Sequence, residues 1–259
     1  MSAVLRALPA LLLGLLLTPA AAQEAVRVDA EIVLAVDASG SMDPFEREVQ
    51  RQGYAEAMRH PDLMRAVTAG WTGQIALSYF EWAGDIRPAS VIPWRLIDSA
   101  EAASAFATEI EAIRMPTWRG TSISRAIHFA IDLLEVSQFD AAKRVIDISG
   151  DGPNNFGPPV TAARDRAVAM GITINALPIM IRPSRGVQLD RYFEDCVIGG
   201  PGAFVLVAHA PEEFAQAIRR KLILEISGAQ PQRLRLASDH DPANCMIGEM
   251  MRPRSFDRF

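Results

Sequence analysis

A continuous apolar run over residues 32–36 ends at an acidic residue, Asp37, near the start of the chain. A strand with one solvated face alternates apolar and polar side chains, so a run without alternation predicts a strand that is buried on both faces. Such strands belong to parallel sheets whose two faces are covered by helices. This one segment therefore favours an α/β fold over an all-helical or all-β fold.

The remaining pattern predicts strands and helices that alternate along the chain. Helical spacing of apolar residues predicts helices over residues 44–59, 99–113, 122–136, 160–170 and 211–226, and apolar runs predict strands over residues 74–82, 86–92, 144–149, 172–177 and 203–208. Strands separated by helices indicate βαβ units. We expect a doubly wound, mostly parallel sheet flanked by helices, as in Rossmann-like folds, with residues 86–92 as one antiparallel edge strand. The pattern predicts a single domain over residues 28–227 and a polar tail over residues 228–259.

The first 22 residues are predicted to be a cleavable signal peptide. Arg6 precedes a short apolar core over residues 8–17, and Ala20-Ala21-Ala22 is a small-residue cleavage site. A membrane anchor needs about 20 apolar residues, and this core is roughly half as long. We therefore expect cleavage after Ala22, a periplasmic or secreted protein, and no membrane span in the mature chain.

Composition excludes several classes of protein. Hydrophobic residues make up 49% of the chain and charged residues 22%, which is typical of a globular protein and not of collagen, a coiled coil or a disordered chain. The mean hydropathy of +0.10 is explained by the predicted signal peptide. The net charge is −5 and basic residues form no cluster, so a nucleic-acid partner is not expected.

Oxygen-bearing side chains gather at the predicted ends of the strands. Asp37 begins the sequence Asp-Ala-Ser-Gly-Ser, which contains Ser39 and Ser41, while Asp151 follows the strand over residues 144–149 and Thr121 precedes a helix. The carboxyl ends of parallel strands meet at one edge of a sheet, so these five side chains are expected to converge there. Hard oxygen donors suit Mg²⁺, Mn²⁺ or Ca²⁺ better than zinc or copper. In the simpler alternative, Asp37 and Ser39 form an Asx-turn and cap a helix.

The order of these motifs resembles the von Willebrand factor A domain. The chain carries Asp-x-Ser-Gly-Ser at residues 37–41, Gly-Thr at residues 120–121 and Gly-Asp-Gly at residues 150–152. In that family these elements form the metal-ion-dependent adhesion site (MIDAS). The resemblance covers residues 28–227 and implies that Ser39, Ser41 and Thr121 ligate a metal, with Asp37 and Asp151 binding directly or through water.

The chain departs from the family at one point in the motif. It reads Ser-Gly-Asp-Gly at residues 149–152, where many members have Thr-Asp-Gly. This variant, together with the signal peptide and the late cysteine pair, also resembles an exported bacterial subset of unknown function. The key aspartate is retained, so the departure concerns the shape of the loop.

The resemblance implies a binding function. Neutral hydroxyl ligands leave the ion with net positive charge, so it can accept an Asp or Glu carboxylate from a protein partner. Loops around the ion are expected to form the partner-binding rim, which comprises Trp118, Arg119, Asn154, Asn155 and Phe156. No nucleophile–base pair is visible, so catalysis is not expected. Two alternatives stay open, namely a metal-dependent hydrolase of the phosphatase type that uses Asp37 or Asp151, and a scaffold in an envelope complex.

Three further predictions concern residues outside the motif. Cys196 and Cys245 are the only cysteines, and export to an oxidising compartment favours a disulfide between them over two free thiols. Closing a loop of about 50 residues would stabilise the fold by about 4 kcal/mol. Asp147, inside a predicted strand, is expected to pair with a basic neighbour. The basic run Arg219-Arg220-Lys221 is expected on the solvated face of the last helix.

Overall fold

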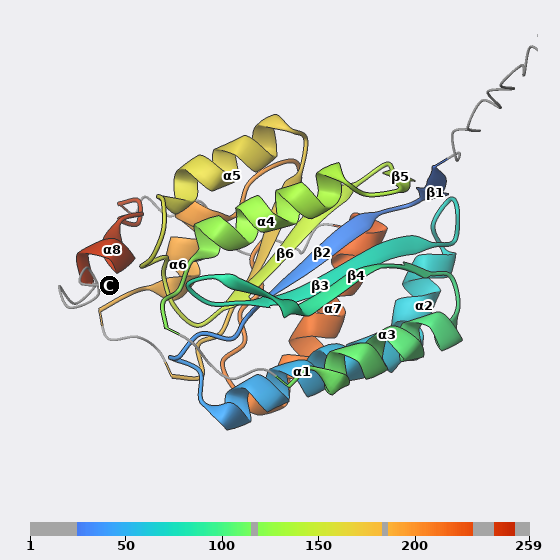
Figure 1. The fold of residues 1–259 in the computed structure, drawn as a ribbon, viewed down its shortest axis with the longest axis horizontal. Coiled ribbons are helices and arrows are strands. Elements are labelled where there is room, and N and C mark those ends of the chain that lie inside the picture. The colour runs from blue at the N-terminus through green and yellow to red at the C-terminus, as the bar shows by residue number, and fades with distance from the viewer. Residues whose placement is uncertain (1–24, 115–118, 183–185, 230–240, 252–259) are drawn as a thin grey trace, which may run out of the picture.

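The computed structural model describes residues 25–114, 119–182, 186–229 and 241–251. Within those residues a five-stranded sheet has the order β4-β3-β2-β6-β7 (Figure 1). Its strands are β2 (Glu31–Asp37), β3 (Ile75–Trp82), β4 (Ile86–Ile97), β6 (Arg144–Gly150) and β7 (Thr173–Pro178). Strand β4 is antiparallel to β3 at one edge, and the other pairs are parallel. Every residue of the central strand β2 is buried, as its unbroken apolar run predicted.

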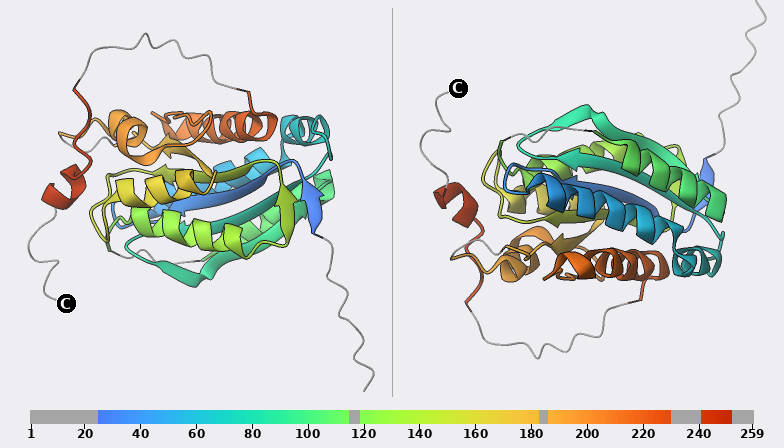
Figure 2. Two further views of the ribbon diagram at one scale, coloured as in Figure 1. Left: turned by 90° about the horizontal axis from the view of Figure 1, so that it is seen from above. Right: turned by 90° about the horizontal axis from the view of Figure 1, so that it is seen from below.

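Helices cover both faces of this sheet (Figures 1 and 2). Alternate residues of β2 point to opposite faces, so Ile32 and Leu34 belong to one core cluster and Val33 and Ala35 to the other. The first cluster includes side chains from α1 (Pro44–Arg59), α2 (Pro61–Thr68), α3 (Ala100–Ala112) and α7 (Phe214–Ser227). The second includes α4 (Ile123–Glu135), α5 (Val160–Ala169), α6 (Leu189–Tyr192) and the π-helical turn η1 (Phe193–Val197). The predicted doubly wound architecture and its antiparallel edge strand are confirmed.

Several short elements were not predicted from the sequence. A two-stranded parallel sheet joins β1 (Val26–Val28) to β5 (Phe139–Ala141), and three residues are too few to show a period. Helix α2 follows α1 after a single residue, His60, because Pro61 cannot continue the α1 hydrogen-bond ladder but is well suited to a first turn. The remaining short elements are η2 (Pro211–Glu213), a 3₁₀ turn, and α8 (Ile247–Met251).

The predicted strand over residues 203–208 is wrong as a continuous element. Val205 makes an isolated bridge to Ala176 of β7, and Ala208 makes one to Ile179, the residue after β7. Two features of β7 interrupt the ladder. Pro178 has no N–H to donate, and the side chain of Asn175 accepts the Phe204 N–H at 3.1 Å. The segment therefore runs along β7 without forming a full ladder.

Helix α7 carries one basic side chain inward. Lys221 is fully buried, so the predicted solvated face is wrong at this position, while Arg220 is exposed. The Lys221 ammonium lies 2.7 Å from Asp147 Oδ1 and 2.5 Å from Glu225 Oε1. Asp147 thus has the basic partner that the sequence predicted.

The described part of the C-terminal tail packs onto the domain. Cys196 and Cys245 form the predicted disulfide, with their Cα atoms 5.4 Å apart. Ala243, Cys245 and Ile247 pack against the core cluster that contains α4 and α5. Among the described residues, no helix is both long and apolar enough to span a bilayer. The predicted signal peptide lies outside the described residues.

Candidate metal centre

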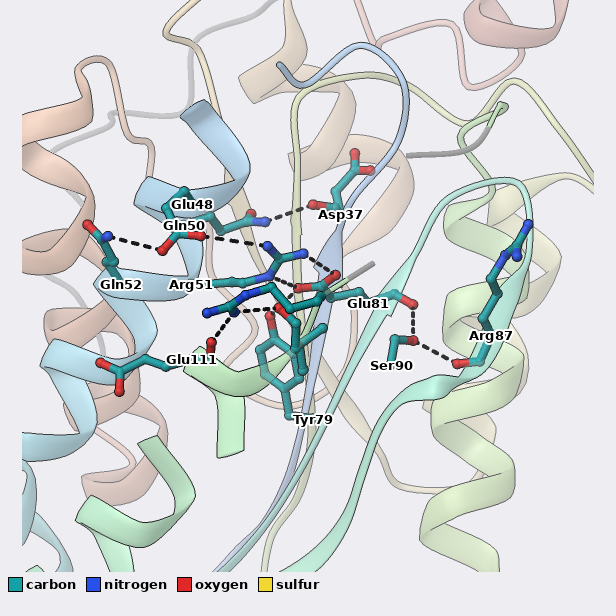
Figure 3. Close-up of polar contacts among 12 residues, drawn as sticks. Asp37, Glu48, Gln50, Arg51, Gln52, Tyr79, Glu81, Arg87, Ser90 and Glu111 are labelled. Carbon is teal, nitrogen blue, oxygen red and sulfur yellow. Dashed lines mark hydrogen bonds and ion pairs between the residues drawn. The ribbon is translucent and has the colours of Figure 1, made fainter. Parts of the chain in front are cut away.

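Asp37 lies at the end of β2, at the carboxyl edge of the sheet. The Gln50 side chain on α1 donates a hydrogen bond of 2.7 Å to the Asp37 carbonyl oxygen (Figure 3). Its own Oε1 accepts from the Ser149 hydroxyl at 3.3 Å, so α1 holds the ends of β2 and β6 together. The carboxylate of Asp37 points away from these contacts toward the loop that follows.

Four of the five predicted ligands form one hydrogen-bonded chain. Asp37 Oδ1 accepts from the Ser39 N–H at 2.7 Å, which is the Asx-turn of the simpler interpretation. The hydroxyls of Ser39 and Ser41 are 2.9 Å apart, and Ser41 Oγ donates to Asp151 Oδ1 at 2.7 Å. This last bond joins loops that are 110 residues apart in sequence. The turn and the convergence therefore both occur, whereas the residue that caps α1 is Asp43 and not Asp37 or Ser39.

Thr121 is tied to the same edge through its backbone. The Thr121 N–H donates to Asn155 Oδ1 at 2.9 Å, and the Thr121 carbonyl accepts from the Asn155 and Phe156 N–H groups at 2.9 and 3.2 Å. Ser122, the next residue, caps α4 and donates its N–H to the carbonyl of Ala83 beyond β3. The Thr121 loop is thus fixed between the end of β3 and the loop that carries Asp151.

The unusual glycine before Asp151 has a packing explanation. A Cβ at Gly150 would lie 3.1 Å from Asp37 Oδ2 and 3.5 Å from the Trp82 ring. The first distance is tighter than an ordinary van der Waals contact. A threonine at this position would therefore crowd the Asp37 carboxylate and the buried indole, whereas glycine leaves room for both.

The two carboxylates are electrostatically unfavourable in the absence of a cation. Burial, together with the nearby Asp151 charge, raises the pKa of Asp37 well above its usual range. Burial also raises the pKa of Asp151, against the lowering effect of the Ser41 hydrogen bond. Asp37 Oδ2 is buried and accepts no hydrogen bond of good geometry among the described residues, although the backbone N–H of Asp151 lies close enough to the carboxylate to lower its pKa. An unpaired acceptor of this kind costs free energy unless a cation or a donor reaches it.

The donor chemistry fits a hard divalent cation. Asp37, Asp151, Ser39, Ser41 and Thr121 supply carboxylate and hydroxyl oxygens, the ligands that Mg²⁺, Mn²⁺ and Ca²⁺ prefer. The described residues contain no metal-binding group of three or more His, Cys, Asp or Glu side chains. The present set contains two carboxylates and three hydroxyls, so it is a different kind of candidate site.

The predicted rim is only partly accessible. Arg119 is exposed, and Asn155 and Phe156 are half-buried, with the Arg125 guanidinium 4.8 Å from the Phe156 ring centroid. Asn154 is fully buried, so its predicted place on the rim is wrong. Its side-chain amide makes internal hydrogen bonds. Oδ1 accepts from the Ser124 N–H, and Nδ2 donates to the Pro158 carbonyl. Trp118 lies outside the described residues.

Two residues beside the site were missed from the sequence. Phe45, in the first turn of α1, is 65% exposed next to the Ser39–Ser41 loop. No local pattern in the sequence indicates this exposure, since the next residue of the same turn, Glu46, is buried. Arg182 follows β7, and its guanidinium forms ion pairs with Glu46 and Asp43 and lies 3.4 Å from the Ser41 carbonyl. No local pattern in the sequence indicates that long-range pairing.

Comparison with known structures identifies the fold. The proximal thread matrix protein 1 of the mussel byssus is 16% identical, with a TM-score of 0.57 over 79% of this chain and 49% of that one. The von Willebrand domain of the type V pilus tip protein Mfa5 from Porphyromonas gingivalis is 13% identical, with a TM-score of 0.56 over 82% of this chain and 99% of that one. Another structure of the mussel protein, at 17% identity and a TM-score of 0.52 over 79% and 49% of the two chains, has a zinc-occupied MIDAS motif.

These similarities concern a domain and not whole proteins. This chain spans about half or less of the mussel protein and of a Lactobacillus rhamnosus pilus adhesin, at 49% and 31% of their lengths. No curated protein matches the chain in sequence. The sequence model of one family does match, over residues 27–230. The chain therefore has the von Willebrand factor A fold and belongs to the family described as "Protein of unknown function (DUF1194)".

Proposed function

We propose that this chain is an exported binding module that holds one divalent metal ion and uses it to bind a carboxylate of a protein partner. Asp37, Ser39, Ser41, Thr121 and Asp151 would hold the ion, with Mg²⁺ as the first candidate and Mn²⁺ or Ca²⁺ as substitutes. The observation that carries the proposal is the Ser41–Asp151 hydrogen bond beside the unpaired, buried Asp37 Oδ2. The nearby Arg182 offsets part of the Asp151 charge, but among the described residues neither Asp37 nor Asp151 forms an ion pair, so a local demand for positive charge remains.

The balance of charge explains why such an ion would bind a partner. Two carboxylates at most neutralise a divalent ion, and the hydroxyl ligands add no charge. A ligand position that faces solvent then favours an anionic oxygen from outside, as a partner's Asp or Glu supplies. Ser41 is exposed, so the site is open on that side.

The surroundings of the site suit recognition of a protein. Phe45 presents an exposed ring and Arg119 an exposed guanidinium on neighbouring loops. Aromatic and arginine side chains contribute most to binding energy at protein interfaces. The similar structures support a binding function, because they include a pilus tip protein and a protein with a zinc-occupied MIDAS.

A metal-dependent capture experiment tests the proposal. The purified protein is immobilised and incubated with envelope extract in about 5 mM Mg²⁺, Mn²⁺, Ca²⁺ or Zn²⁺, a concentration above the range of weak extracellular sites, or in EDTA. We expect partner capture with metal and none with EDTA, and loss of capture in the Ser39→Ala/Ser41→Ala variant. The matched control is Ser104→Ala on α3, away from the site.

Each alternative has its own outcome in this experiment. Capture that survives EDTA contradicts the metal-dependent mechanism and favours a scaffold. Turnover of phosphoesters that disappears in Asp37→Asn contradicts the binding-module proposal and favours a hydrolase. Isothermal titration of the same variants with Mn²⁺ shows whether a lost capture reflects lost metal.

A further inference from the structure

The C-terminal segment over residues 241–251, here called the strap, returns to the metal edge of the domain. Two contacts attach its first half to η1. Cys245 is bonded to Cys196, and the Ala243 N–H donates to Asp195 Oδ2 at 2.7 Å. Asp195 is fixed in turn, since its carbonyl accepts from the Arg164 side chain at 2.9 Å. The disulfide therefore anchors the strap to a rigid part of the core.

The second half of the strap presses on the loop that follows β6. Glu249 Oε1, on α8, accepts a hydrogen bond of 2.7 Å from Asn154 Nδ2. Gly248 packs backbone to backbone against the same residue, since a Cβ there would lie 2.0 Å from the Asn154 carbonyl oxygen. Any residue other than glycine would push the strap away from this loop.

Asn154 connects the strap to the candidate metal ligands. It is fully buried, its N–H donates to the Tyr192 hydroxyl at 3.1 Å, and its Oδ1 accepts from the Ser124 N–H at 3.1 Å. It lies three residues after Asp151 and directly before Asn155, whose side chain accepts from the Thr121 N–H. A shift of Asn154 would thus move both the Asp151 loop and the Thr121 loop.

We propose that the strap is a positioning element for the metal centre whose engagement depends on the Cys196–Cys245 bridge. With the bridge closed, Gly248 and Glu249 hold Asn154 and thereby keep Asp151 and Thr121 in place for the ion. With the bridge open, the strap leaves and metal binding weakens. This inference rests on the metal site proposed above and adds its regulation.

The dependence on the bridge follows from the small size of the strap, whose other contacts are a few hydrogen bonds and partly buried apolar side chains. Helix α8 has five residues, which is too short to be stable by itself. The disulfide keeps α8 at high effective concentration beside Asn154, and without it the Glu249 and Gly248 contacts must form against the full entropy of a free tail. Opening the bridge therefore shifts the strap toward the released state.

A protein dithiol could open the bridge by ordinary exchange. Cys245 is half-buried, whereas Cys196 is fully buried, so the Cys245 sulfur is the accessible point of attack. One thiolate of the dithiol forms a mixed disulfide with Cys245, and Cys196 leaves and takes a proton. The second thiol then displaces Cys245 as a thiol, and the dithiol ends as a disulfide, so two electrons and two protons are transferred to the protein.

The test compares metal affinity and local amide exchange in the full chain. Mn²⁺ titrations are made on the oxidised protein, on the protein reduced with dithiothreitol, on Cys245→Ser, and on Gly248→Ala, which keeps the disulfide. We expect at least a tenfold weaker Mn²⁺ affinity in the last three and faster hydrogen exchange at the Thr121, Ser124 and Asn155 amides. Met251→Ala, on an exposed side chain of α8, is the matched control and should change neither.

The outcomes separate this proposal from the metal site itself. Equal Mn²⁺ affinity in the oxidised protein, the reduced protein and Gly248→Ala overturns the role of the strap, even if every form binds metal. If no form binds Mn²⁺, the proposed function fails, and amide exchange in the metal-free protein decides about the strap. Unchanged hydrogen exchange at the Thr121 and Asn155 amides in Gly248→Ala then overturns the role of the strap, and faster exchange supports that role.

Discussion

Two pairs of acids in this domain differ in where their positive charge comes from. Asp147 on β6 and Glu225 on α7 share the ammonium of Lys221, and all three residues are buried. Asp37 and Asp151, at the carboxyl edge, form no ion pair with any described residue. We call the first group the inner cluster and the second the edge pair.

The difference shows which acids are structural and which are available for binding. A buried carboxylate needs a counter-charge, and the inner cluster contains its own cation, Lys221, away from solvent. The edge pair lies beside the exposed Ser41, so its counter-charge can enter and leave. The same chemical requirement thus gives a fixed ion cluster in one region and a candidate exchangeable metal site in the other.

Removal of the internal cation should give the largest effect. Lys221→Met leaves Asp147 and Glu225 buried without a cation, and breaking a buried ion pair on one side costs about 3–5 kcal/mol of unfolding free energy. Urea unfolding measures it. Arg220→Met removes the same charge from the exposed neighbour and should cost less than about 0.5 kcal/mol. Equal losses in both variants would show that the inner cluster is not sealed.

Addition of an external cation should give the next largest effect, and only at the edge pair. Mg²⁺ at about 100 times its Kd should raise the unfolding free energy by about 2.7 kcal/mol, because it binds the native state alone. Asp37→Asn should abolish this gain without destabilising the metal-free protein, since it removes a carboxylate whose charge is unfavourable there. Asp147→Asn should keep the gain. A Mg²⁺ response that survives in Asp37→Asn would contradict the assignment of the site.

The two regions also differ in how far the sequence could predict them. Asp37, Ser39, Ser41 and Asp151 follow predicted strands, and strand ends in a parallel sheet must meet, so their convergence could be predicted. For the ion pair between Lys221 and Asp147, the sequence predicted only that Asp147 needs a basic partner. Asp147 interrupts a buried strand and requires a basic neighbour, but helical spacing did not place Lys221 inward, because it belongs to a run of three basic residues.

The parts that could not be predicted depend on tertiary contacts. Asn154 was expected on an exposed rim because loops beside a site are usually accessible. It is buried because Tyr192 and Ser124 contact it from the domain and Glu249 contacts it from the strap, almost a hundred residues later in the chain. Likewise, the segment at residues 203–208 has a strand-like sequence, and it is the neighbouring Pro178 and Asn175 that prevent a full ladder.

The pH dependence of stability should distinguish the two regions by a smaller amount. Burial, with the nearby Asp147 charge, raises the pKa of Glu225 from 4.5 to about 8. The native state therefore keeps a proton that the unfolded chain releases between these values. The resulting stability is fully present below pH 4.5 and is lost as the pH rises to about 8, by about 1.4 kcal/mol per pH unit for one proton.

Urea unfolding between pH 6 and pH 7 measures this slope. Glu225→Gln should flatten it, with or without Mg²⁺, because the inner cluster does not exchange its cation. The raised pKa of Asp37 and Asp151 contributes a slope of the same sign, and saturating Mg²⁺ should remove that part alone. If Mg²⁺ also removes the part of the pH slope that Glu225→Gln removes, the two regions do not differ in whether their cation exchanges.

The smallest effect on folding is expected at the exposed ring beside the edge pair. Phe45 is 65% exposed, so Phe45→Ala should change the unfolding free energy by less than about 0.5 kcal/mol. If the edge pair and its ion bind a partner, the same variant should weaken metal-dependent capture by about 1–2 kcal/mol, since a partner would cover the ring. Val136→Ala, on a side chain 77% exposed after the last turn of α4, should alter neither quantity. Equal capture by the Phe45→Ala and Val136→Ala proteins would show that the partner does not extend over α1, and the ion with its remaining rim would then have to account for the whole interaction.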